Sequence, residues 1–183
     1  MLRELDLPGV LLNEPTIHSD DRGDFHEWFK VSDFEQHVGH PFPLRQANLS
    51  TSQAGVLRGL HFAENPPGQA KYVICPVGRI FDVAVDVRVG SPTFGQHVSA
   101  ELSATNRCGL YIPAGFAHGF VALEDSTVVY LTTSEYAPGI EHTINPFDEE
   151  LGIAWPGSNH VLSARDAAAP PLGHAPLPRW EDA

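Results

Sequence analysis

The stretch Ile80-Phe-Asp-Val-Ala-Val-Asp-Val-Arg88 decides the fold class, because polar and apolar side chains alternate along it. Successive side chains of a strand point to opposite faces, so Phe81 and the three valines share one face. The other face carries Asp82, Asp86 and Arg88. A strand with one apolar and one charged face either separates a core from solvent or, in a barrel, packs on its outer side and lines a polar cavity within.

Further apolar segments of strand type recur along the chain, and turn-forming residues separate them. They are Tyr72–Cys75, Gly109–Ile112, Phe116–Leu123 and Thr127–Thr132. Their spacing of roughly ten residues, in a chain with 16 Gly and 16 Pro, predicts an all-β sandwich or barrel. Helix prediction is confined to brief segments such as Ser32–Val38, in which Ser32 caps the N-terminus and Glu35 lies three residues further on.

Length and composition predict one globular domain. The chain has 183 residues, of which 42% are hydrophobic and 19% are charged. From about Gly157 the composition shifts to Ala, Pro and His. Residues 1–156 are therefore predicted to form the domain, including its N-terminal strands, and residues 157–183 a C-terminal strap and Pro/Ala-rich tail of the same domain.

The charge balance argues against several kinds of partner. Lys and Arg total 11 against 23 Asp and Glu, a formal net charge of −12, whereas nucleic acids and membrane surfaces require a basic footprint. The sequence offers neither an apolar signal core at the N-terminus nor an apolar stretch of membrane-spanning length. Cys75 and Cys108 lie in no CxxC motif and make no disulfide scaffold. We expect a cytoplasmic protein with no nucleic-acid or membrane partner.

Two histidines lie in strand-like segments and draw attention to chemistry. His61 ends Val56-Leu-Arg-Gly-Leu-His61, and His118 lies in Pro113-Ala-Gly-Phe-Ala-His-Gly-Phe120. A lone histidine in such a strand is more often a hydrogen-bonded core residue than a functional one. Two of them, together with a strand-borne Lys71 and Arg58, favour a polar cavity.

A metal site is the alternative interpretation of these histidines. The pattern Pro113-x-Gly115-x-x-His118 resembles the second half-motif of the cupins, the double-stranded β-helix proteins. Metal-binding cupins normally also have an HxH pair followed by Glu, but this sequence contains no HxH. Lys71 near His61 would repel a divalent cation. The resemblance therefore implies a cupin-type jelly-roll barrel with a few short helices and no metal.

Further motifs make the resemblance more specific. They are Asp21-Arg-Gly23, Phe25-x-Glu27, Arg58-Gly-Leu-His61, Pro66-Pro-x-Gln-x-Lys71, Gly90-Ser-Pro-Thr-Phe-Gly95, Tyr136-x-Pro138, Asn145-Pro-x-Asp148, Ile153-Ala-Trp-Pro156 and Ser163-x-Arg-Asp166. Together with Phe81–Arg88 and Pro113–Phe120, they occur in order over about residues 3–170. In this combination the sequence resembles the dTDP-4-dehydrorhamnose 3,5-epimerase family.

The resemblance implies a reaction and its catalytic residues. Members of the family are metal-free, cofactor-free dimers that invert the carbons flanking the 4-keto group of dTDP-4-dehydro-6-deoxy-D-glucose. The reaction needs a base, a group that stabilises the enolate and an acid on the opposite face. The family positions imply His61 as the base, paired with Asp166. They also imply Lys71 next to the enolate oxygen and Tyr130 as the acid.

The resemblance also implies residues that bind the dTDP-sugar. The planar guanidinium of arginine matches phosphate oxygens in pairs, and an aromatic ring stacks on the thymine. The positions implied for substrate binding are Arg22, Glu27, Gln46, Asn48, Arg58, His118, Tyr136, Glu141 and Arg165, with Tyr136 as the stacking ring. The family also implies a homodimer, in which the N-terminal segment is a natural element to exchange between subunits.

Three questions stay open at the level of the sequence. Strict alternation puts Arg58 and His61 on opposite faces, so both reach one cavity only if Gly59 forms a bulge or Arg58 lies at the cavity mouth. The motifs do not separate a 3,5-epimerase from a mono-epimerase that inverts only C3 or only C5 in another deoxysugar pathway. A metal-dependent cupin oxygenase and a non-catalytic nucleotide-sugar binder are the alternatives from other functional classes.

Overall fold

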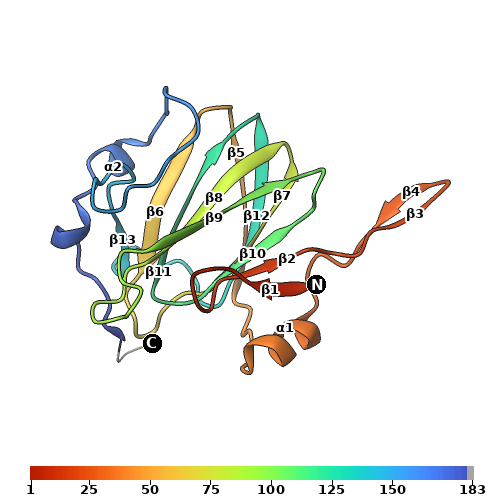
Figure 1. The fold of residues 1–183 in the computed structure, drawn as a ribbon, viewed down its shortest axis with the longest axis horizontal. Coiled ribbons are helices and arrows are strands. Elements are labelled where there is room, and N and C mark those ends of the chain that lie inside the picture. Colours follow the sequence, from red (N-terminus) through yellow and green to blue (C-terminus); the bar gives the residue numbers. More distant parts are fainter. Residues whose placement is uncertain (181–183) are drawn as a thin grey trace.

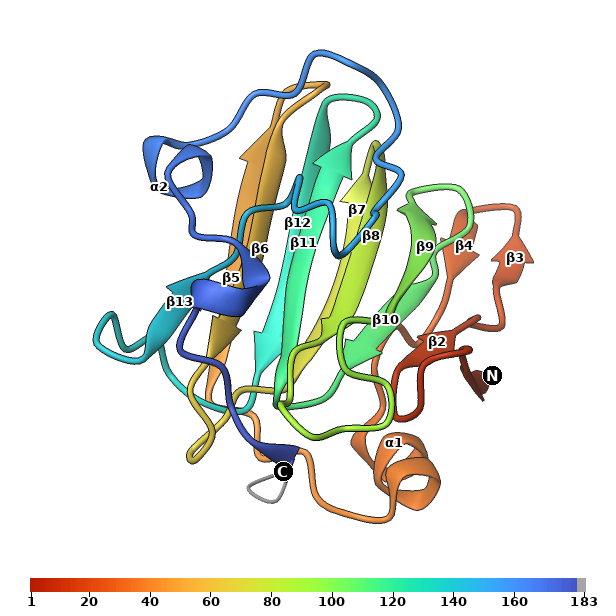
Figure 2. The same ribbon diagram turned by 60° about the vertical axis from the view of Figure 1, so that its left-hand side comes forward.

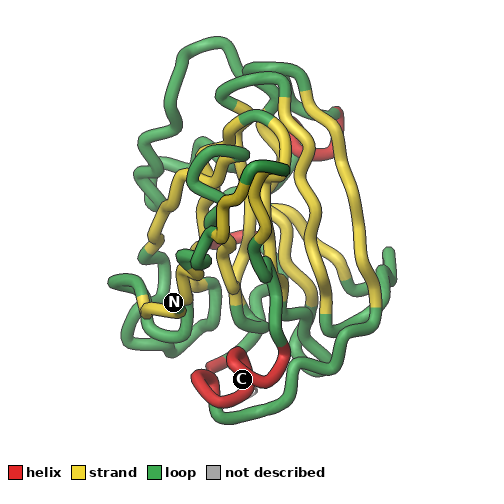
Figure 3. The backbone as a smooth tube through the Cα atoms, turned by 90° about the vertical axis from the view of Figure 1, so that its right-hand side faces the viewer, coloured by secondary structure: helices red, strands yellow, loops and turns green. Residues whose placement is uncertain are grey.

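Two antiparallel sheets face each other in the computed structural model, which describes residues 1–180 (Figure 1). The first sheet contains, in spatial order, β1 (Leu2–Glu4), β2 (Leu11–Asn13), β10 (Gly109–Ile112), β7 (Lys71–Val77), β12 (Ser126–Thr132) and β5 (Gln46–Ser52). The second contains β13 (Glu141–Thr143), β6 (Leu57–Ala63), β11 (Phe116–Ala122), β8 (Arg79–Asp86) and β9 (His97–Ser103). Figure 3 shows the strands with most loops gathered at their ends. The predicted all-β jelly-roll fold is confirmed.

The remaining elements lie at the periphery of the two sheets (Figure 2). They are the hairpin β3 (His18–Asp20) and β4 (Gly23–Phe25), the helices α1 (Val31–Val38) and α2 (Ala164–Ala167), and the 3₁₀ helix η1 (Leu172–His174). The hairpin projects well away from the rest of the molecule in Figure 1. No helix in the described part of the chain is long and apolar enough to cross a membrane.

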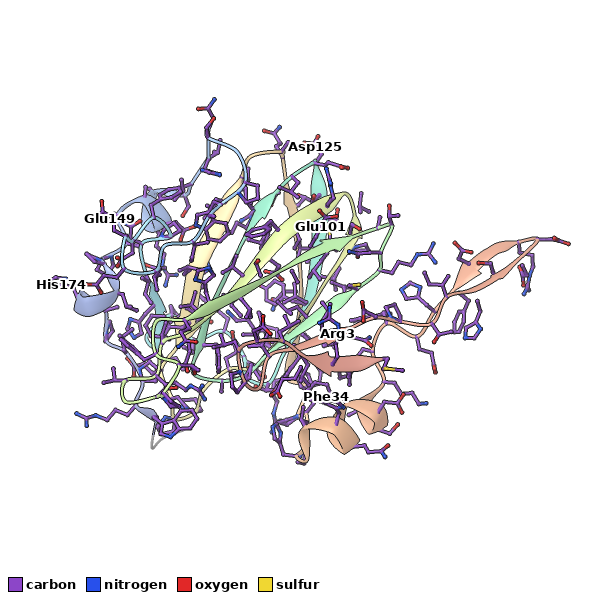
Figure 4. All side chains as sticks on the ribbon, viewed as in Figure 1. Arg3, Phe34, Glu101, Asp125, Glu149 and His174 are labelled. Carbon is purple, nitrogen blue, oxygen red and sulfur yellow. The ribbon has the colours of Figure 1, made fainter. Side chains whose placement is uncertain are left out.

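The start of α1 differs from the predicted one. The chain enters the helix in extended conformation at Lys30, which occupies the N-cap position without a capping side chain. Ser32 therefore lies inside the first turn and is not the cap. The position of the helix is set by Phe34, which is 1% exposed and packs on Tyr111 with ring centroids 4.5 Å apart. Figure 4 labels Phe34 on α1, below the strands of the first sheet.

Strand β8 has the two faces that alternation predicts, and both are buried. Ile80 and Ala84 belong to the core between the sheets. The opposite face, with Phe81, Val83 and Val85, and Val87 just past the strand, packs against the C-terminal segment through Ile144, Leu151, Trp155 and Leu172. Figure 2 shows this blue segment crossing the outside of the second sheet. Of the predicted strap and tail, residues 157–180 belong to this segment, and 181–183 lie outside the described residues.

The end of this segment contacts the second sheet through the side chain of Arg88, which also forms a buried ion pair with Asp86. Two guanidinium nitrogens of Arg88 donate to the carboxylate of Asp86 at 2.8 Å each, and Asp86 is fully buried. The Arg88 guanidinium lies between the rings of Phe116 and Trp180, 4.3 and 4.2 Å from their centroids. The attraction between the cation and the two aromatic faces stabilises the guanidinium in addition to the ion pair. The C-terminal segment thus packs beside the first residue of β11, the strand that carries His118.

Candidate active site

A cavity of about 300 Å³ lies between the two sheets, and both sheets contribute to its walls. Its lining residues are Gln46, Asn48, Ser50, Arg58, His61, Gln69, Lys71, His118, Phe120, Tyr130, Thr132, Tyr136, Glu141 and Arg165. All the predicted site residues are among them except Arg22, Glu27 and Asp166. Residues up to 119 positions apart in the sequence, from Gln46 to Arg165, therefore meet in one polar cavity.

A β-bulge brings Arg58 and His61 into the same cavity. On β11, His118 is opposite His61 and Phe120 is opposite Arg58, so two residues of β6 face the single Gly119. Gly59 adopts a φ of +128°, and a Cβ built there would lie 2.5 Å from the Cα of Gly119. The bulge at Gly59 is one of the two solutions that alternation left open.

His61 forms a pair with Asp166. Its Nε2 is 2.7 Å from Oδ1 of Asp166, which is 4% exposed and lies in α2. The hydroxyl of Ser163 caps this helix by accepting from the Asp166 backbone N–H, which fixes where the carboxylate lies. Burial opposes ionisation of Asp166, but hydrogen bonds from His61, Ser163 and the Gly59 backbone keep its pKa below the usual value. Asp166 is therefore a carboxylate that orients the imidazole.

Lys71 extends from β7 into the cavity and is buried. Its Nζ donates to the backbone oxygen of His61 at 3.3 Å. Burial lowers the pKa of Lys71 to about 8, although Glu141 and Asp82 favour the charged form. Near neutral pH the cavity therefore holds a poorly solvated ammonium group, which is suited to stabilising negative charge on a ligand.

A second histidine–aspartate pair, His118 and Asp82, lies in the same cavity wall. Nε2 of His118 is 2.5 Å from Oδ1 of Asp82, which is fully buried. The other carboxylate oxygen, Oδ2, has no hydrogen-bond partner among the described residues. Alternation along the strand predicted Asp82 on its polar face but indicated no role for it. Its contact with His118, 36 residues away, is set by the pairing of β8 with β11.

Tyr130 faces the cavity from β12, on the sheet opposite His61. Val128 and Tyr130 alternate inward on this strand, and Tyr130 packs against the core at the base of the cavity. Burial raises the pKa of Tyr130, Glu141 raises it further, and Arg58 lowers it. The phenol therefore keeps its proton near neutral pH and can donate it.

Arginine and amide side chains occupy the remaining wall. The Nε of Arg58 donates to Oγ of Ser52 and its Nη2 to the backbone oxygen of Thr51, both at 2.9 Å. Arg165 donates to the backbone oxygen of Glu141 at 2.7 Å. Ser50 was not predicted, but its buried hydroxyl also lines the cavity without a hydrogen-bond partner in residues 1–180. Only its alternation with Gln46 and Asn48 along β5 could have indicated it.

Arg22 and Glu27 lie outside the cavity of the chain that carries them. Arg22 is in the turn of the β3–β4 hairpin, pairs with Asp20 at 2.6 Å and has a side chain that is 90% exposed. Glu27 lines a separate hollow of about 440 Å³ beside α1. Neither residue lines the cavity that the other predicted site residues share, so their predicted contact with the substrate stays a prediction.

Within residues 1–180, no three His, Cys, Asp or Glu side chains form a group that could hold a metal ion. In both His61 and His118, a ring nitrogen forms a hydrogen bond with a carboxylate, and the ammonium of Lys71 lies in the same cavity. The chemistry that this arrangement supports is proton transfer beside a stabilised negative charge.

Comparisons with known proteins agree with this chemistry. The family model described as dTDP-4-dehydrorhamnose 3,5-epimerase matches residues 4–174. A protein of that name from Mycobacterium tuberculosis is 52% identical over 187 residues, with 98% of this chain and 93% of the relative covered. A dTDP-4-dehydro-6-deoxyglucose 3-epimerase from Streptomyces bikiniensis is 48% identical, with 95% of this chain and 90% of the relative covered.

Solved structures show the same likeness. The rmlC epimerase of Mycobacterium tuberculosis superposes with a TM-score of 0.95 at 51% identity, covering 99% of this chain and 94% of the other. A Legionella pneumophila epimerase in complex with dTDP-4-keto-L-rhamnose superposes with a TM-score of 0.94 at 41% identity, covering 98% of both chains. The chain therefore belongs to the dTDP-4-dehydrorhamnose 3,5-epimerase family of isomerases.

Proposed function

We propose that this protein inverts C3 and C5 of dTDP-4-dehydro-6-deoxy-D-glucose to give dTDP-4-dehydro-L-rhamnose. The observation that carries the proposal is that His61 and Tyr130 line one cavity from opposite sheets, and that Lys71 enters the same cavity from the sheet of Tyr130. Epimerisation removes a proton from one face of a carbon and returns a proton to the other face. A base and an acid on opposing walls match that requirement.

The hydrogen bond to Asp166 determines which atom of His61 acts as the base. Because Nε2 contacts the ionised carboxylate, the neutral imidazole carries its proton on Nε2 and presents an unprotonated Nδ1. Nδ1 takes the proton alpha to the ketone, and the electron pair of the C–H bond moves into the enolate. The Lys71 ammonium stabilises the enolate oxygen, and the Tyr130 hydroxyl delivers a proton to the opposite face.

The remaining polar residues hold the nucleotide. Arg58 and Arg165 supply guanidinium groups for the diphosphate, while Asn48 supplies neutral hydrogen bonds. Tyr136 is 55% exposed at the cavity edge, where its ring stacks on the thymine. The Legionella pneumophila relative, solved with dTDP-4-keto-L-rhamnose, supports this substrate class. His118 and Glu141 contact the sugar from the remaining walls.

A C3 mono-epimerase is the second candidate function. It is favoured by the Streptomyces bikiniensis relative, whose 48% identity is close to the 52% of the Mycobacterium tuberculosis 3,5-epimerase. Both activities use the same deprotonation step, so the groups that line the cavity serve either of them.

We also propose that the protein is a homodimer built on the outer face of the first sheet. Leu49, Val129 and Ile74 are neighbours across β5, β12 and β7 and form what we call the outer patch. Leu49 is 66% exposed although its strand neighbours line the cavity. A solvated apolar patch of this kind is typical of an interface. In the dimer, the projecting hairpin carries Arg22, and Glu27 behind it, toward the partner's cavity.

The oligomeric state is testable by light scattering coupled to gel filtration. A dimer has about twice the monomer mass of 19.9 kDa, and Leu49→Asp in the outer patch should reduce the mass to that of one chain. A wild-type mass of one chain would refute the dimer. The cytoplasmic location and the absence of nucleic-acid and membrane partners stay predictions from the sequence.

The activity is tested by proton NMR of dTDP-4-dehydro-6-deoxy-D-glucose incubated with the protein in deuterium oxide. Deuterium at both C3 and C5, unaffected by prior dialysis against a chelator, is the expected result. Exchange at C3 alone would assign the mono-epimerase, and no exchange would contradict both candidates. His61→Ala should abolish exchange at both carbons while dTDP still binds, so it serves as the control for specific catalysis.

A further inference from the structure

The short stretch of chain that contains α2 is held by the backbone at both of its ends but not between them. On its N-terminal side, backbone hydrogen bonds of 2.9 Å join Val161 to the chain around the start of β6. On its C-terminal side, the Pro170 backbone oxygen accepts from the N–H of Asn145 at 2.8 Å. Within the described part of the chain, no backbone group of residues 162–169 hydrogen-bonds to another segment. The place of α2 therefore depends on its side chains.

Only one side chain of α2 is buried, and it is charged. Asp166 is buried, whereas Arg165 and Ala167 on either side of it are exposed. The Asp166 carboxylate accepts from His61 and from the backbone N–H of Gly59 on β6. A single turn of helix is not stable by itself, and α2 has no buried apolar side chain to hold it. Docking of α2 on β6 therefore depends on the hydrogen bonds of one carboxylate, and Figure 2 shows α2 at the periphery beside β6.

Arg165 and Asp166 leave this turn in different directions. They are consecutive residues, so their side chains lie about 100° apart around the helix axis. Arg165 lines the cavity, and its Nη2 donates to the backbone oxygen of Glu141 at 2.7 Å. Its other guanidinium nitrogens donate to no described residue, so they are available to a ligand. Asp166 is not among the lining residues and instead contacts Nε2 of His61. One turn of helix thus joins a cation that faces the ligand to the carboxylate that orients the base.

We propose that α2 couples nucleotide binding to the orientation of the base, and that Arg165 is a positioning residue for Asp166. A diphosphate bound to Arg165 holds α2 against β6, and α2 then holds Asp166 on His61. Without a ligand, α2 leaves β6 in a fraction of the molecules, and His61 then lacks its carboxylate. This role of Arg165 rests on the proposed function, because the diphosphate is taken to be that of the dTDP-sugar. The bound substrate thus completes the site that acts on it.

The first test removes the Asp166 side chain and measures the Kd for dTDP by isothermal titration calorimetry. Coupling is reciprocal, so Asp166→Ala should weaken binding at Arg165 and raise the Kd about 10-fold. Charge alone predicts the opposite, because removing a carboxylate near the cavity favours an anionic ligand. Asp166→Asn keeps an oxygen acceptor for His61 and Gly59, and its Kd should stay within about 3-fold of wild type. An unchanged or lower Kd for Asp166→Ala would overturn the proposal.

A double-mutant cycle shows whether the effect of Asp166 passes through Arg165. Arg165 is exposed, so Arg165→Met should fold, and in this background Asp166→Ala should change the Kd by less than about 2-fold. Arg58→Met is the matched control, because Arg58 lines the same cavity from β6 and not from α2. In the Arg58→Met background, Asp166→Ala should still raise the Kd about 10-fold. An equal effect of Asp166→Ala in both backgrounds would mean general loosening of the site and would contradict the coupling.

Steady-state kinetics provide a readout that loss of a binding contact would not move. Such a loss raises KM and leaves kcat unchanged. Arg165→Met should also lower kcat about 10-fold at saturating substrate, because α2 then holds Asp166 on His61 in fewer molecules. Arg165→Lys keeps a cation for the diphosphate and should recover most of the lost kcat. A kcat of Arg165→Met within about 2-fold of wild type would refute the positioning role.

Hydrogen–deuterium exchange follows the docking of α2 directly. The backbone N–H groups of Ala167 and Ala168 donate within the turn, to Ser163 and Ala164, and exchange when α2 leaves β6. Saturating dTDP should slow their exchange about 10-fold in the wild type and not in Arg165→Met. Equal exchange in the wild type with and without dTDP would overturn the proposal. A wild-type protein that fails to bind dTDP would contradict the proposed function itself, whereas binding without protection of α2 contradicts the coupling alone.

Discussion

Substituting Gly59 by Ala tests whether the bulge on β6 is what positions Arg58 and His61 in the same cavity. The added Cβ would lie 2.5 Å from the Cα of Gly119 and 2.9 Å from the backbone oxygen of His118. Both atoms are backbone, so no side-chain rotation relieves the overlap. The φ of +128° adds strain of about 1–3 kcal/mol for a residue with a Cβ. Overpacking adds about 2 kcal/mol, and relief requires β6 and β11 to separate.

Gly23 provides a control with nearly the same backbone conformation. Its φ is +131°, but a Cβ there would meet nothing within 4 Å. Gly23→Ala therefore measures the conformational strain alone. The Gly59→Ala protein should be less stable than the Gly23→Ala protein by about 2 kcal/mol. For a domain of this size, this difference corresponds to roughly 4–8 °C in Tm. Calorimetric melting curves measure this difference.

The bulge also has a catalytic consequence. Moving Arg58 or His61 by about 1 Å should lower kcat/KM by about 10²-fold, because proton transfer depends on close positioning. The NMR epimerisation assay measures this loss. If Gly59→Ala melts within about 1 °C of Gly23→Ala and keeps wild-type activity, the reasoning from the bulge is refuted.

Three further predictions address charge in the site and at the C-terminal segment. The ammonium of Lys71 is present below its pKa of about 8 and lost above it, so kcat/KM should fall as the pH rises through about 8. A pH–rate profile that stays level to about pH 9.5 would remove Lys71 from this role. Asp166→Asn should lower kcat by about 10²-fold or more while changing the Kd for dTDP by less than about 3-fold, as seen by kinetics and calorimetry. A kcat near wild type would show that His61 needs no carboxylate. Arg88→Met should cost about 3–5 kcal/mol in thermal unfolding because it leaves the Asp86 carboxylate buried without its partner. Adding Asp86→Asn should restore part of the loss, and its failure to do so would contradict the ion-pair explanation.

Local patterns predicted the strands better than the contacts between them. The period of two along Ile80–Arg88 separates the side chains as observed, because alternation is a property of any extended chain. The sequence indicated a bulge at Gly59 as one way for Arg58 and His61 to reach the same cavity, since strict alternation puts them on opposite faces. The capping role predicted for Ser32 was wrong, because burial of Phe34 sets the helix position.

Contacts between distant segments set the rest of the site, and no local pattern encodes them. The pairing of Asp82 with His118 depends on the register of two strands. The amide of Gln46 is engaged by a backbone group 90 residues later, which no spacing rule indicates. The exposed position of Arg22 on a projecting hairpin, paired with Asp20, also depends on structure that its motif does not describe. Resemblance to the family supplied Arg22, Gln46 and His118 as positions without their geometry, and it assigned no role to Asp82.

The covering of β8 by the C-terminal segment has a consequence for synthesis on the ribosome. Every strand of the two large sheets precedes Ile144 in the chain, so all of them can leave the exit tunnel and pair before the segment emerges. During that interval Phe81 and Val83 face water, and the nascent chain is most open to chaperone binding or aggregation. Arrival of the segment buries this face and delivers Asp166 to His61 in the same event. Until the segment packs on the sheet, His61 lacks the carboxylate that orients it.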